Sequence, residues 1–179
     1  MGITILFLLS SCRKNEKAKT AELCRELENS VMLSPAFDSL VKVSMGLPNF
    51  FRSKVLLTAG SCYSTRVEQM QQARIYLREA YRIAPRDVKN LVALELTRLY
   101  GSLILRDSCV EEAIRFISRV PSKVVFTREE EAKFYYLGAC FFKSIDIDRA
   151  FKAVDQALSL YRGLSDTEGE IEAYRLKAT

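Results

Sequence analysis

The segment Phe134-Tyr-Tyr-Leu-Gly-Ala-Cys-Phe141 introduces a spacing that recurs along the chain. Gly138 is followed twelve residues later by Ala150, and Val154 and Ala157 lie four and seven residues beyond that alanine. Residues three and four apart lie on the same face of a helix. The spacing therefore predicts two successive helices that pack closely where their side chains are small.

Two earlier segments repeat this spacing. Gly101 and Gly60 take the place of the glycine, although in the first copy the alanine follows the glycine by thirteen positions rather than twelve. Each copy then carries a small residue followed by apolar residues four and seven positions on. These are Ala73, Leu77 and Ala80 in the first copy, and Ala113, Ile117 and Val120 in the second. A proline, Pro85, follows the first copy and ends its second helix.

These residues resemble the tetratricopeptide-repeat (TPR) family, whose pattern is a Leu-Gly pair and an aromatic residue on a first helix, two alanines on a second helix and a closing proline. The copies lie near residues 53–86, 94–121 and 131–164. Their alanine-to-alanine spacings of 40 and 37 residues exceed the family repeat of about 34. The resemblance implies an all-α fold, a TPR-like α-solenoid of about three helix pairs within residues 49–179.

Further helices are expected at both ends of this array as caps. Residues 20–48 predict two helices, the first over 20–33 and the second beginning at Pro35 after the N-cap Ser34; this pair caps the array or forms a degenerate repeat. Gly46-Leu47-Pro48 ends the second helix, and Asn49 is expected to cap the next one.

Two further signals mark helix positions in the last third of the chain. Thr127-Arg-Glu-Glu130 fits a capping box at the start of the third copy. A final helix is expected over residues 166–177, with Ile171, Tyr174 and Leu176 available to cover the last repeat.

The first residues carry a different kind of signal. The apolar run of residues 3–9 is too short to span a bilayer but suits a signal segment. Leu9-Ser10-Ser11-Cys12 then resembles the bacterial lipobox, which implies a mature protein that begins with a lipidated Cys12. Residues 1–11 are thus interpreted as a lipoprotein signal and residues 12–19 as a basic tether to an anionic membrane. The alternative is a short apolar tail that packs against the domain.

The composition argues against catalysis. The 179 residues include no histidine, and no two of the five cysteines form a C-x-x-C pair, so the chain is predicted not to be an enzyme and to hold no metal or cofactor. Its net charge of +5 suits acidic partners. Nucleic acid is not expected, because no dense basic stripe is interleaved with aromatic residues.

The family resemblance also implies a binding surface, since the first helix of each TPR pair lines a concave groove that holds partner proteins. The residues expected to line this groove are Lys54, Arg98, Arg106, Tyr135, Phe142 and Lys143. An acidic segment of a partner protein lying over Tyr135 and Phe142 is the expected ligand. The alternative is that these residues form ordinary solvated faces and edge packing.

Cysteine and carboxylate positions complete the predictions. Cys62 and Cys140 are expected to be buried apolar residues too far apart to form a disulfide, Cys109 is expected to be the most exposed thiol, and Cys24 is left open. The carboxylates of residues 111–112 and 129–131 are interpreted as stabilising helix N-termini rather than as a catalytic or metal site.

Three functional hypotheses follow. The first is a TPR scaffold for protein–protein interaction, anchored in a bacterial cell envelope and facing the periplasm. The second is a TPR subunit of a periplasmic solute-uptake system, similar to the T component of TRAP-type systems, which would contain an apolar channel. The third is a cytoplasmic TPR adaptor or secretion chaperone that carries no lipid.

Overall fold

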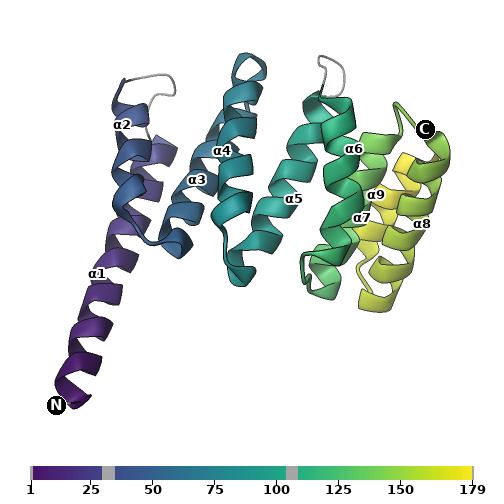
Figure 1. Cartoon of the computed structure of the whole chain (residues 1–179). Helices are drawn as coiled ribbons and strands as arrows, with labels where there is room; N and C mark the ends of the chain where they lie inside the picture. The colour runs from purple at the N-terminus through teal and green to yellow at the C-terminus, as the bar shows by residue number, and fades with distance from the viewer. Residues whose placement is uncertain (1, 30–34, 104–108, 179) are drawn as a thin grey trace. The chain divides into compact units, whose positions relative to one another are not determined.

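The fold was obtained as a computed structural model, which describes residues 2–29, 35–103 and 109–178, and the side chains of these residues except 2–13, 35–37 and 67. Within these ranges the backbone forms nine α-helices and three short 3₁₀ helices, and no strand (Figure 1). The prediction of an all-α fold is confirmed. The chain divides into two compact units, Met1–Val88 and Lys89–Thr179, which are described separately.

The first unit consists of four α-helices and two 3₁₀ helices. In chain order these are α1 (Gly2–Asn29), α2 (Pro35–Val43), η1 (Ser44–Gly46), α3 (Asn49–Ser64), η2 (Val67–Gln69) and α4 (Met70–Ile83). Helix α3 lies at the centre of the unit, because it packs against both α1 and α4. Its buried residues face both neighbours, which leaves little of it exposed to solvent.

The α3–α4 pair has the close packing that the repeat pattern predicts. Ala73, Leu77 and Ala80 of α4 are fully buried. Gly60 of α3 faces them, and a Cβ atom added at this glycine would lie 2.5 Å from Leu77 Cγ. The glycine is therefore required for the two helices to approach this closely. Helix α4 ends at Ile83, two residues before Pro85, as the sequence predicts.

The start of the first unit differs from the prediction in two respects. Helix α1 begins at Gly2 rather than near Thr20, so residues 12–19, expected to form a tether, continue the same helix. Asn49 is the first residue of α3 and not its N-cap; Pro48 precedes the helix, and its carbonyl oxygen accepts hydrogen bonds from the amides of Phe51 and Arg52. The predicted start of α2 at Pro35 is confirmed, whereas Ser34 lies outside the described residues.

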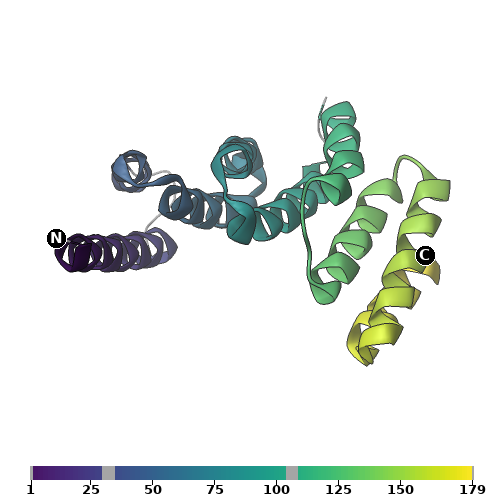
Figure 2. The ribbon, with the colours of Figure 1, turned by 60° about the horizontal axis from the view of Figure 1, so that its bottom comes forward.

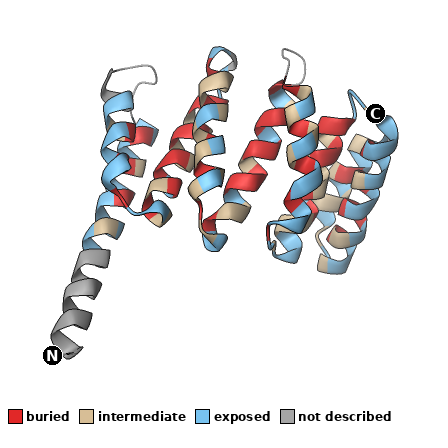
Figure 3. Ribbon diagram, in the orientation of Figure 1, coloured by how far each residue is buried: buried red, intermediate tan, exposed pale blue. Residues whose placement is uncertain are grey.

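The second unit contains the other five α-helices. These are α5 (Arg86–Leu103, whose first turn belongs to the first unit), α6 (Val110–Arg119), α7 (Arg128–Phe142), α8 (Ile147–Leu164) and α9 (Thr167–Ala178), with η3 (Val120–Ser122) after α6. Helix α7 runs beside α8 (Figures 1 and 2), and α9 packs on α8. Buried residues form stripes along the helices (Figure 3).

Local hydrogen bonds fix the ends of α7 and α8. The capping box predicted for α7 is confirmed: Thr127 Oγ1 accepts from the Glu130 amide at 3.2 Å, and the Glu130 carboxylate accepts from the Thr127 amide at 2.9 Å. Asp146 caps α8 by accepting from the Arg149 amide at 3.1 Å. At the other end of α8, Ser165 adopts a left-handed conformation with φ of 57°.

The turn after α8 is a Schellman motif that sends α9 back along α8. The Ser165 amide donates to the Arg162 carbonyl, and the Asp166 amide donates to the Tyr161 carbonyl. Asp166 then caps α9 through the Gly169 amide at 2.9 Å. Because the connection is this short, α8 and α9 must run antiparallel.

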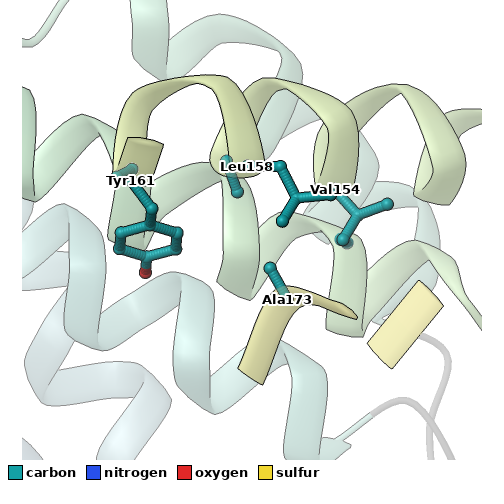
Figure 4. Close-up of a cluster of buried hydrophobic side chains, with 7 residues drawn as sticks. Val154, Leu158, Tyr161 and Ala173 are labelled. Atoms are coloured by element: carbon teal, nitrogen blue, oxygen red, sulfur yellow. The ribbon is translucent and has the colours of Figure 1, made fainter. Parts of the chain in front are cut away.

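Apolar and small side chains hold α7, α8 and α9 together (Figure 4). The buried members of this cluster are Ala132, Ala139, Val154, Ala157, Leu158, Tyr161 and Ala173. The prediction that Ala150, Val154 and Ala157 form the buried face of α8 is confirmed. Helix α9 approaches closely because Gly169 lies against the Tyr161 ring, where any Cβ atom would collide with the ring.

Two packing predictions for this unit are wrong in detail. Gly138 does not face α8; its missing Cβ points toward Ile117 of α6, and the α7 residue in the α8 cluster is the next one, Ala139. On α9, Ile171 and Tyr174 remain exposed, and the covering side is formed by Gly169, Ala173 and the half-buried Leu176. In both cases the side chain that faces the neighbouring helix is one or two residues away from the expected one.

Candidate partner-binding site

Five of the six residues predicted for a binding groove lie in the described part of the chain, and they are divided between the two units. Lys54 belongs to the first unit, and Arg98, Tyr135, Phe142 and Lys143 belong to the second. Arg106 lies outside the described residues. Each residue is therefore described by its surroundings within its own unit.

Lys54 of α3 is exposed, and its ammonium lies 4.5 Å from the centroid of the Phe50 ring, one turn earlier on the same helix. A cation over an aromatic face contributes about 0.5–1 kcal/mol at an exposed site. Leu57 and Ser61, which share this face, are half-buried. The face is thus accessible, with one positive charge held in position.

Arg98 of α5 is paired within its own helix. Its guanidinium donates two hydrogen bonds to the carboxylate of Glu95, at 2.6 and 3.0 Å. The hydrogen bond from Glu95 raises the pKa of Arg98 above its ordinary value, opposed by partial burial. Because the guanidinium already binds the Glu95 carboxylate, Arg98 presents a weaker positive potential to a partner than an arginine without a neighbouring carboxylate.

Tyr135 lines a small cleft at the start of α7, with a volume of about 110 Å³. The other residues around the cleft are Pro121, Val124, Phe126, Glu131 and Phe134. Phe126 stacks on Phe134 with 5.2 Å between ring centroids, which fills most of the space. Burial, and then the nearby Glu131 carboxylate, raises the pKa of Tyr135. The cleft has room for only a few water molecules.

Phe142, predicted to face a partner, is only 7% exposed. Its ring packs edge-on against Phe141 at 5.1 Å, and the guanidinium of Arg149 lies over it at 5.6 Å. Phe142 is therefore a core residue at the end of α7. The prediction failed because the next helix begins only a few residues later and covers this ring.

A larger pocket opens beside Lys143, where α7 ends and α8 begins. Its volume is about 290 Å³. The residues that line it come from the ends of three helices: Ala139, Lys143, Ile147, Ala150, Phe151, Val154, Leu176, Lys177 and Ala178. Seven of these nine are apolar and the other two are lysines. An apolar concavity with a few placed charges is the usual form of a binding site.

Of the residues that line this pocket, only Lys143 was predicted from the sequence as a binding residue. A signal for it was present, since Ile147, Phe151, Val154, Leu158 and Tyr161 alternate at spacings of four and three and so form one apolar stripe along α8. The repeat pattern was based on a different set of α8 residues, Ala150, Val154 and Ala157, and did not include Ile147 or Phe151. Ile147 and Phe151 are 55% and 42% exposed, so the first two turns of the stripe remain open to solvent.

The thiols do not form a reactive centre. Cys109, expected to be exposed, is 6% exposed directly before α6. Cys24, Cys62 and Cys140 are half-buried, which is more open than predicted for the last two, and burial is the main cause that raises the pKa of each. A raised pKa keeps these thiols protonated and poorly nucleophilic. The Cys12 side chain lies outside the described residues.

The carboxylate clusters stabilise helix N-termini, as predicted. Glu111 and Glu112 lie in the first turn of α6, and Glu129 to Glu131 lie in the first turn of α7. Glu112 accepts from the Tyr100 hydroxyl at 2.7 Å, and Glu130 accepts from Asn90 at 2.6 Å. Across the described part of the chain, no three Cys, Asp or Glu side chains come together as metal ligands.

In the ranges that the structure describes, every helix is too short or too polar to cross a bilayer.

Comparison with known proteins adds no relative. No protein-family model, curated protein or solved structure matches this chain. The pocket and the helix packing are therefore the basis for the functional proposals.

Proposed function

We propose that this protein is a TPR-like scaffold that binds other proteins and is held at a bacterial envelope membrane by a lipid on Cys12. One observation carries the scaffold part of the proposal. In each unit, a helix pair is closed by small residues at or next to the positions that the repeat spacing selects: Gly60 with Ala73 in α3–α4, and Ala139, one residue after the expected Gly138, with Ala157 in α7–α8.

Two further features support the scaffold. Helix α9 packs on α8 as a capping helix does in a solenoid, burying one small face and leaving its other residues in water. The surface also keeps several large apolar side chains exposed, among them Met45, Ile75 and Phe151. Single exposed apolar residues are ordinary, but those beside a pocket are typical of protein-binding surfaces.

The anchor rests on sequence. Leu9-Ser10-Ser11-Cys12 follows a short apolar run and precedes the basic residues Arg13 and Lys14. Basic side chains next to a lipid anchor add about 1 kcal/mol each of attraction to an anionic leaflet. The lipid and the charge together supply the two signals that stable anchoring requires.

The anchor is tested by intact mass of the protein expressed in a bacterial host, with Cys12→Ala as the matched variant. The expected result is that the wild type loses residues 1–11 and gains the mass of a diacylglycerol, whereas the variant does not. An unmodified N-terminus in both proteins would refute the anchor and leave a scaffold without a lipid.

The scaffold function is tested separately by photo-crosslinking in cells. A photoreactive phenylalanine analogue is placed at Lys54 and Ser102, which are exposed on the first helices α3 and α5, and at Arg82, which is exposed on the second helix α4. We expect discrete crosslinked protein bands from the first two positions and not from Arg82. The same bands from all three positions, or none, would contradict a groove formed by the first helices.

A further inference from the structure

The pocket at the start of α8 lies beyond the part of α8 that the described residues of α9 cover. Helix α8 has 18 residues and α9 has 12, which correspond to lengths of about 27 and 18 Å. Near the turn, Gly169 lies against Tyr161; at the far end, Leu176 and Lys177 reach Val154 and Asp155. The first two turns of α8, with Ile147 and Phe151, extend past this point.

The uncovered turns continue the same apolar face that α9 covers elsewhere. In the covered part, Val154, Leu158 and Tyr161 are buried against Ala173 (Figure 4). In the uncovered part, Ile147 and Phe151 are exposed around a pocket of about 290 Å³. Filling it would remove apolar surface from water, which contributes about 25 cal/mol per Å² of that surface.

Charge restricts what can fill the pocket. Among the described residues that line it, Lys143 and Lys177 are the charged ones, and none is acidic. The Lys177 ammonium donates to Asp155 Oδ1 at 2.6 Å on the outer side of α8. An ammonium has three donors, so Lys177 can also bind a carboxylate at the pocket. An occupant that carries a carboxylate can pair with these ammonium groups, whereas a purely apolar occupant would only remove water from them.

The volume restricts the occupant further. Pockets that enclose a drug-sized ligand have volumes of about 300–1,000 Å³, and this one lies at the lower limit. Such a volume suits one or two aliphatic or aromatic side chains. Side chains of this kind, buried in a pocket and surrounded by charges, are the usual anchors of a protein–protein contact.

We infer that this pocket, the α8 pocket, binds an acidic peptide segment of a partner protein, with an apolar side chain inserted between Ile147 and Phe151 and a carboxylate on Lys143 or Lys177. This inference rests on the proposed scaffold function and specifies its site and the chemistry of its partner. It adds a binding surface at the α7–α8 turn and the last turn of α9 to the one proposed along the first helices.

Binding is measured by fluorescence anisotropy of the full chain with labelled twelve-residue peptides. The probes consist of glutamates around a central Leu-Leu, Ile-Ile, Phe-Phe or Met-Met pair. We expect at least one to bind, at least tenfold more tightly than its counterparts with lysines in place of the glutamates or serines in place of the apolar pair. Failure of all four to bind, or equal binding of the lysine counterparts, would overturn the inference.

Variants with matched controls then locate the site. Phe151→Ser and Lys177→Glu are each expected to weaken binding at least fivefold. Ile171→Ser and Lys152→Glu make the same kinds of change at exposed positions on α9 and α8 outside the pocket, and are expected to leave binding within twofold of wild type. Wild-type affinity in both pocket variants would overturn the inference.

Two measurements separate this inference from other outcomes. If a photoreactive residue at Phe151 gives no crosslinked partner in cells while Lys54 does, the α8 pocket is refuted and the scaffold stands; if neither position does, the scaffold itself fails. Sedimentation of the wild type and Phe151→Ser detects self-association. A dimer that dissociates only in the variant would show that a second copy fills the pocket, against the inference.

Discussion

Gly60→Ala is a sensitive test of the helix packing. Its effect on stability combines a steric cost against Leu77 with the higher helix propensity of alanine. The Cβ of an alanine at this position would lie 2.5 and 2.7 Å from Leu77 Cγ and Cδ2. Leu77 is fully buried, so its side chain has little room to move away. Overpacking of a core costs about 1–3 kcal/mol, whereas alanine gains about 1 kcal/mol over glycine in a helix. We therefore expect a net loss of up to about 2 kcal/mol.

Two other glycines supply controls for the helix-propensity term. Gly163 of α8 has no atom near its missing Cβ, and Gly138 of α7 has Ile117 Cγ2 at 3.8 Å, an ordinary contact distance. Replacing either glycine with alanine should raise stability by about 0.5–1 kcal/mol. The same chemical change is thus expected to have opposite signs at Gly60 and at these two positions.

The assay is urea denaturation followed by circular dichroism, with the midpoint compared among the three variants and the wild type. A second substitution, Leu77→Ala, removes the atoms that the new Cβ would strike. In that background Gly60→Ala should no longer be destabilising. If Gly60→Ala is as stabilising as Gly163→Ala in the wild-type background, then α3 and α4 do not approach each other at this glycine and the proposed packing is wrong.

Three further predictions concern the second unit. Ser165→Gly should stabilise it by about 1 kcal/mol in urea denaturation, because glycine adopts the left-handed conformation of this residue without strain; a destabilised variant would contradict the Schellman geometry. Thr127→Ala should destabilise by about 1 kcal/mol in the same assay through loss of the cap on α7, and Thr127→Ser should restore most of it. Burial raises the pKa of Tyr136 from 10.0 to about 12, so the folded chain keeps a phenol proton that the unfolded chain loses. The stability from this group should be present below pH 10 and lost as the pH rises toward 12; absorbance titration against Tyr136→Phe should reveal the late-titrating tyrosine, and its absence would refute the burial.

The features that the sequence predicted well are those set by short-range rules. The capping box at Thr127 needs only two side chains three residues apart. The buried faces of α4 and α8 follow from residues spaced three and four apart, and Pro85 marks the end of α4 by sterics alone. None of these features depends on which element packs opposite, so they could be predicted from one amino-acid sequence.

The features that were missed depend on the neighbouring element. Gly138 and Ala139 differ by about 100° around the helix axis, and only the position of α8 decides which of them faces it. Phe142 and Cys109 both lie where a helix ends or begins, so their burial depends on elements other than their own helix. The α8 pocket is lined by residues from three helices, and no local pattern encodes how their ends meet.

The way α9 is attached has a consequence for the motions of the second unit. Ala173 is its only fully buried residue in the described part of the helix, and its neighbours across the interface are contributed mainly by α8. A helix with so little buried area opens at a lower free energy than the rest of its unit. Its amide protons should therefore exchange with solvent deuterium sooner than those of α8, and any ligand that contacts Leu176 and Lys177 should slow that exchange along the whole of α9.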